Sequence, residues 1–72
     1  MRVDWFRVIT DLERAGVSLR AQSSAADVSL GTVAYWKNGG QPKHYNGQLL
    51  LHLYSRTFGS TSAPIQATLA ST

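Results

Sequence analysis

The stretch SLRAQSSAADVSLGTVAYWKNG, residues 18–39, predicts two short helices joined by a tight turn. Ser18 and Ser29 are of the type that caps the first turn of a helix. Asp27, between them, tolerates the left-handed backbone of a turn better than most residues. Glycine at position 39 commonly ends a helix. The spacing is that of a helix-turn-helix.

The two predicted helices differ in how well they fill a core. In the second, Val33 and Trp36 lie on one face and would bury it against the first helix. In the first, the core-facing positions include two polar residues, Gln22 and Ser23. A buried glutamine without partners costs a few kcal/mol, roughly 2–7. We therefore expect this helix to rotate, or Gln22 to reach solvent along a neighbour.

Working outward, the sequence predicts a further helix on each side. An apolar stripe that begins at Trp5 indicates a helix near residues 5–15, capped by Asp4 and ended by Gly16. Phe6, at the edge of this stripe, is expected in the core, with an exposed position as the alternative. After a loop at residues 39–43, a leucine-rich stripe predicts a helix from about Asn46 or Gly47 to Thr57, ended by Gly59. Trp5 and Trp36 both lie on apolar stripes that face the core. We therefore expect their rings to pack in the core and not to stack on the bases of a single-stranded nucleic acid.

The predicted fold is a small all-α, four-helix domain over residues 1–58, followed by a flexible tail rich in serine, threonine and alanine over residues 59–72. Ile65 and Leu69, four residues apart in the tail, leave a fifth, docking helix as an alternative. A domain this small buries a modest core, so self-association is expected.

By its caps, its turn and the register of Val33 and Trp36, the chain resembles the phage repressor and Cro family over residues 3–58. The resemblance implies that the second motif helix lies in the major groove of DNA. It also implies base-contacting positions, which fall on Leu30, Gly31, Tyr35 and Asn38. The chain departs from the family's pattern at three positions. Gln22 stands where the family usually has an aliphatic residue, Ser23 where it has alanine, and Asp27 where it has glycine.

The exposed side of that helix offers few groups for reading bases. Asn38 suits adenine, and Leu30 or Ala34 suits the thymine methyl, but the surface has no arginine for guanine. Phosphate contacts are better supplied, by residues at the helix starts and by nearby lysines: Ser18, Arg20, Ser29, Thr32, Lys37 and Lys43. The two serines act first as caps, and the alternative for Arg20 is an ion pair with Asp11 or Glu13.

Charge and composition narrow the function classes. The formal net charge is +3, and all four acidic residues precede Val28, so an anionic partner can approach the second half of the chain. There is no cysteine, and His44 and His52 have no acidic neighbour, so we expect no metal and no cofactor. The hydroxyls lie at helix caps and in the tail, and they form no nucleophile–base pair, so we expect no enzymatic activity. No apolar run is long enough for a membrane span, which makes a cytoplasmic protein the expectation.

The leading hypothesis is therefore a small phage-type transcription regulator that binds double-stranded DNA as a homodimer. The alternative keeps the helix-turn-helix but uses its surface to bind a protein, such as host RNA polymerase or another regulator, since fold alone does not specify function. A third hypothesis is a toxin–antitoxin component whose tail folds onto a toxin.

Overall fold

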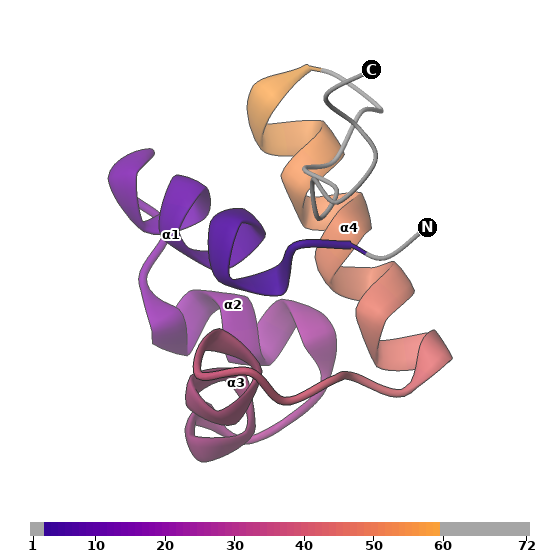
Figure 1. Ribbon diagram of the computed structural model, residues 1–72. Helices are drawn as coiled ribbons and strands as arrows, with labels where there is room; N and C mark the ends of the chain where they lie inside the picture. The colour runs from indigo at the N-terminus through magenta and orange to yellow at the C-terminus, as the bar shows by residue number, and fades with distance from the viewer. Residues whose placement is uncertain (1–2, 60–72) are drawn as a thin grey trace, which may run out of the picture.

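The computed structural model describes residues 3–59, which form four helices (Figure 1). These are α1 (Trp5–Arg14), α2 (Leu19–Ala26), α3 (Leu30–Lys37) and α4 (His44–Phe58). The predicted all-α class is confirmed, with no strand in the described residues. The predicted flexible tail beyond Gly59, and the alternative of a docking helix at Ile65 and Leu69, lie outside the described residues. Within residues 3–59, no helix has the length and apolar character that crossing a membrane requires.

The first three helices begin at the capping residues that the sequence predicts. The side chains of Asp4, Ser18 and Ser29 each accept a hydrogen bond from the main-chain N–H three residues later, at 3.1, 3.1 and 3.2 Å. Each bond satisfies one of the amides that a helix start leaves without an intrahelical partner. The starts of α1, α2 and α3 are therefore fixed by local sequence.

The same three helices end in one motif. Gly16, Asp27 and Gly39 adopt left-handed φ angles of 95°, 60° and 109°. In each case the next residue's N–H bonds to the carbonyl five residues back, at 2.9, 3.0 and 2.8 Å. The left-handed residue's own N–H bonds to the carbonyl three residues back, completing a Schellman motif. Gly59, with φ 66°, closes α4 by a single bond to the carbonyl of Ser55 at 2.8 Å.

Helix α4 begins at His44, two or three residues earlier than predicted. Lys43, at its N-cap position, makes no side-chain capping bond, so the local sequence gives no start signal. Contacts with other helices hold the first turns instead. Asn46 Nδ2 donates to the carbonyl of Ala26 at 2.9 Å, which attaches α4 to the end of α2. Gly47 is buried, and a Cβ there would lie 3.1 Å from the Trp5 ring.

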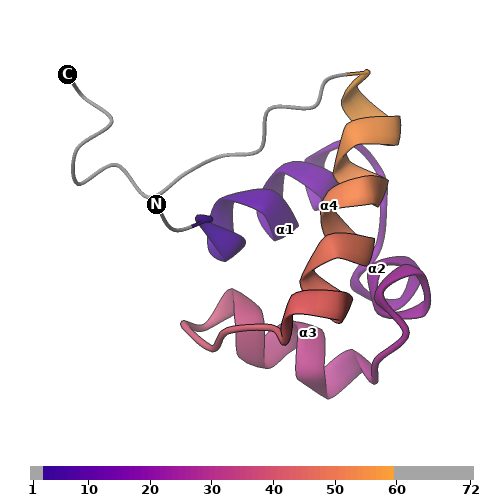
Figure 2. The ribbon, with the colours of Figure 1, turned by 90° about the vertical axis from the view of Figure 1, so that its right-hand side faces the viewer.

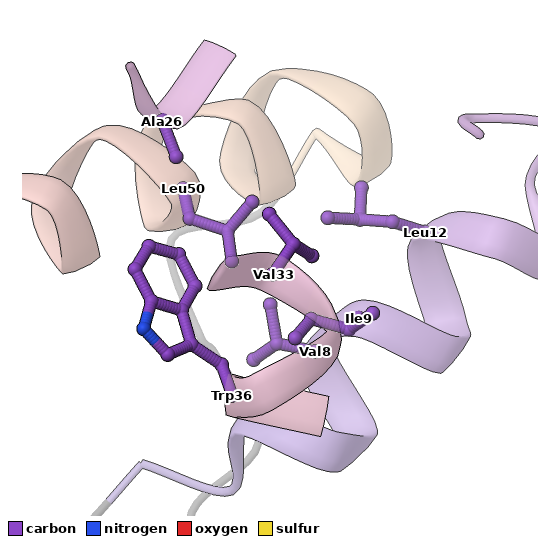
Figure 3. Packing of buried hydrophobic residues seen from close by; sticks show 7 residues of the cluster. All are labelled: Val8, Ile9, Leu12, Ala26, Val33, Trp36 and Leu50. Atoms are coloured by element: carbon purple, nitrogen blue, oxygen red, sulfur yellow. The ribbon is translucent and has the colours of Figure 1, made fainter. Parts of the chain in front are cut away.

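The core collects apolar side chains from all four helices (Figure 3): Val8, Ile9, Leu12, Ala26, Val33, Trp36 and Leu50. The rings of Trp5 and Trp36 lie 6.5 Å apart between centroids, tilted by 47°. Trp36 is only 3% exposed, as predicted for a core residue. The prediction for Phe6 was wrong, because its side chain is 56% exposed. One residue beyond Trp5, it lies about 100° around the helix from the stripe that the core covers.

Gln22 follows neither of the two courses that the sequence predicts. It is fully buried, and its Nε2 donates to the carbonyls of Ile9 and Val17, both at 3.2 Å. These bonds attach α2 to α1 and to the loop between them. Gln22 Oε1 has no hydrogen-bond partner among the described residues, a cost of about 1–3 kcal/mol for a buried polar atom. Ser23, also buried, bonds to the carbonyl of Arg20 at 2.7 Å, as expected.

We predict that Gln22→Glu lowers the free energy of unfolding by about 3–5 kcal/mol at pH 7, because a buried carboxylate would face two carbonyl oxygens. Gln48→Glu makes the same change at an exposed position of α4 and should alter it by less than about 0.5 kcal/mol. Urea unfolding followed by tryptophan fluorescence measures both values. Equal stability of the two variants would show that the buried amide bonds do not hold α2.

Candidate nucleic-acid interface

Helices α2 and α3 cross steeply. Figure 1 shows α2 from the side and α3 nearly along its axis, and Figure 2 shows the reverse. This is the arrangement of a helix-turn-helix, in which the two helices meet at about 90–120°. In both views α3 lies at the lower edge of the part of the chain that the structure describes, with none of the other three helices below it. One side of α3 is therefore open to a partner.

The open side of α3 carries four exposed residues, which we call the α3 face: Leu30, Gly31, Tyr35 and Asn38. Leu30 is 41% and Tyr35 64% exposed, large fractions for side chains of this size. Val33 and Trp36 turn the opposite side into the core. The structure thus places together the four residues to which the family resemblance assigns base contacts.

A hollow of about 340 Å³ lies beside the α3 face, between α3 and the start of α4. It brings together three predicted site residues, Thr32, Tyr35 and Lys43. Two further polar residues line it that the sequence did not predict as site residues, Gln41 and Asn46. Nothing in the local sequence marks Gln41, and Asn46 is placed by its bond to the end of α2. The hollow therefore adds polar groups and one cation to the edge of the α3 face.

Two of the predicted contact residues are already engaged within the protein. Lys37 Nζ lies 2.8 Å from Glu13 Oε1, with each side chain about a third exposed, and this ion pair joins α3 to α1. Asn38 Nδ2 donates to the carbonyl of Ala34 at 2.9 Å, on its own helix. A phosphate contact by Lys37, or an adenine contact by Asn38, would have to compete with these bonds.

Arg20 is exposed at the first turn of α2 and makes no ion pair with any residue from 3 to 59. The alternative pairing with Asp11 or Glu13 is wrong, because both carboxylates have other partners. Asp11 lies 3.9 Å from Arg7 and accepts a hydrogen bond from Tyr54 at 3.0 Å. Burial, and then this bond, raise the pKa of Tyr54.

The serines at the helix starts act as caps, as predicted, and Ser29 Oγ also lies 2.9 Å from Thr32 Oγ1. From Val28 onward the sequence has no acidic residue, so no carboxylate of α3, α4 or the loop between them opposes an anion. Within the described part of the chain, no three histidine or acidic side chains come together as a metal site needs. The surface around the α3 face suits an anionic partner better than a cation.

We predict a coupling free energy of about 0.2–1 kcal/mol between Glu13 and Lys37, the range of partly exposed ion pairs. A double-mutant cycle with Glu13→Gln and Lys37→Met, read by chemical unfolding, measures it. The pair Arg7–Asp11, at 3.9 Å and with Arg7 64% exposed, serves as the control and should couple more weakly. No measurable coupling between Glu13 and Lys37 would mean that Glu13 does not restrain Lys37.

The α3 face and the hollow beside it form one candidate surface. It suits an anionic partner, because the sequence has no acidic residue after Asp27. Comparison of the chain with models of protein families, with curated proteins and with solved structures finds no match.

Proposed function

We propose that this protein binds double-stranded DNA with α3 in the major groove, as a small transcription regulator of phage or prophage type. The exposed α3 face, at the edge of the molecule, is the observation that carries the proposal. An α-helix fits the width of the major groove, and helix-turn-helix proteins place their second helix there.

Two exposed cations support this orientation of the protein on DNA. Arg20 lies at the start of α2, and Lys43 lines the hollow between α3 and α4. Contacts from such positions to phosphates fix the register of a helix in the groove. The start of α3, capped by Ser29, adds a partial positive charge.

The proposal includes a homodimer on two half-sites about 34–36 Å apart, one turn of DNA. A monomer of this size offers few contacts, and a second copy doubles them. The exposed Phe58 and the half-buried Leu51 on α4 are candidates for the dimer contact, because they leave apolar surface outside the core.

We predict that the double variant Arg20→Ala/Lys43→Ala binds a mixed-sequence duplex more weakly. The slope of log affinity against log salt concentration is negative, and it should become shallower by about 2, because two phosphate contacts are lost. Fluorescence anisotropy of a labelled duplex over a series of salt concentrations measures the slope. As a control, Arg56→Ala removes an exposed cation near the opposite end of α4, far from α3 in both views, and should keep the parent slope.

The proposal fails if the parent protein shows no salt-dependent binding to any duplex at low ionic strength, since phosphate contacts give at least weak non-specific affinity. Amide shifts of labelled protein in an NMR titration locate the contact. Shifts at residues 18–20 and 29–43 that fade with salt are expected, and shifts confined to the end of α4 would contradict the orientation.

A protein partner, such as host RNA polymerase or another regulator, is the second candidate. One observation favours it: Leu30 and Tyr35 are the largest exposed groups of the α3 face, while the amide of Asn38 is occupied. Aromatic side chains often anchor protein interfaces. With purified host RNA polymerase as the probe, Tyr35→Ala should abolish this binding, and Arg20→Ala/Lys43→Ala should leave it unchanged. If the partner is DNA instead, the loss of the two cations should weaken binding strongly.

A further inference from the structure

Gly40 has a role that its own backbone does not explain. It follows Gly39, whose left-handed φ of 109° requires glycine at the end of α3. Gly40 itself does not have a positive φ, so the backbone would accept other residues there. The obstacle is a side chain: a Cβ at position 40 would lie 2.3, 2.4 and 2.6 Å from three ring carbons of Tyr35. Glycine at position 40 therefore leaves the space that the Tyr35 ring occupies.

The position beneath the ring is itself fixed. The N–H of Gly40 donates to the carbonyl of Tyr35 at 2.8 Å, as part of the motif that ends α3, and Gly40 is buried. The Tyr35 ring thus packs on its own helix end with one side and exposes the other, at 64% of the residue's surface. Tyr45 is exposed to the same 64%, and no glycine lies under its ring among the contacts of residues 3–59.

The exposed side of Tyr35 lies where the proposed DNA contact needs a base-reading group. Tyr35 belongs to the α3 face and also lines the hollow that Lys43 lines. It therefore lies between the groove-facing side of α3 and a candidate phosphate contact. A ring that is already packed at this place reaches a base edge without first losing the rotamer freedom that a mobile side chain gives up on binding.

The chemistry of the α3 face selects which base feature such a ring can read. Its exposed groups are the apolar Leu30, the bare backbone of Gly31 and the ring of Tyr35, while the amide of Asn38 is bound to the carbonyl of Ala34. In the major groove, the apolar feature of a base pair is the C5-methyl group of thymine. A flat apolar ring face is suited to this methyl.

We propose that Tyr35 determines sequence specificity by contacting a thymine methyl in the major groove, and that Gly40 is the positioning residue that orients its ring. The inference rests on the proposed DNA binding and names the base feature that it recognises. The Tyr35 hydroxyl is not required, whereas the ring and its packing on Gly40 are.

The test begins with a duplex selected from a random-sequence pool by the parent protein. Each thymine is then replaced singly by deoxyuridine, which removes only the methyl group. We expect about a fourfold loss of affinity at one thymine per half-site, the factor that follows from burying one methyl-sized group. Tyr35→Phe should keep this ratio, and Tyr35→Ala should reduce it to about one.

Gly40→Ala should also reduce the thymine-to-uracil ratio to about one, and combining it with Tyr35→Ala should change nothing further. The exposed ring can swing aside for the added methyl, so this variant should fold, and its Tyr35 ring protons should move toward random-coil shifts in NMR spectra. Tyr45→Ala is the matched control and should keep the parent ratio.

The outcomes separate the two proposals. Absence of binding to the random pool at low salt overturns the proposed DNA binding and this inference with it. Binding without any thymine-to-uracil difference overturns this inference alone. A parent-like ratio in Gly40→Ala overturns the positioning role of Gly40, and a lost ratio in Tyr35→Phe would assign the contact to the hydroxyl instead of the ring.

Discussion

The rest of the structure depends on how α3 is held. This eight-residue helix buries two side chains, Val33 and Trp36, while the Lys37–Glu13 ion pair ties it to α1 at the surface. Burying a side chain of this size contributes roughly 1.5–3 kcal/mol. Because both side chains point into the core, the opposite side of α3 must point away from it. That opposite side is the exposed α3 face. Trp36 also contacts Trp5, so the same residue joins α3 to the start of α1.

Much of the fold could be predicted because its signals are local. Three capping side chains and three left-handed residues lie within a few positions of the helix ends that they fix. Asp27 shows how far this holds: it adopts the left-handed turn at φ 60°, although glycine would do so at lower cost. The exposed face of α3 followed from the same local pattern, since Val33 and Trp36 define it.

The features that sequence did not predict depend on partners distant in the chain. Gln22 is buried because the carbonyls of Ile9 and Val17 lie within reach of its amide. Helix α4 begins early because Asn46 bonds to the end of α2. Lys37 lies at a position suited to phosphate contact, yet Glu13, 24 residues earlier, holds it. No periodicity or capping rule reports such pairings.

The way α4 begins has a consequence for the order of folding. The first three helices carry start and stop signals within their own segments, so each turn can form before the chain has collapsed. The first turn of α4 has no capping side chain and depends on α2 and on Trp5 being in place. We expect this turn to form late and to open first in native-state hydrogen exchange. Because Lys43 and the hollow lie at this turn, one side of the proposed DNA-binding surface depends on a turn that other helices must hold in place.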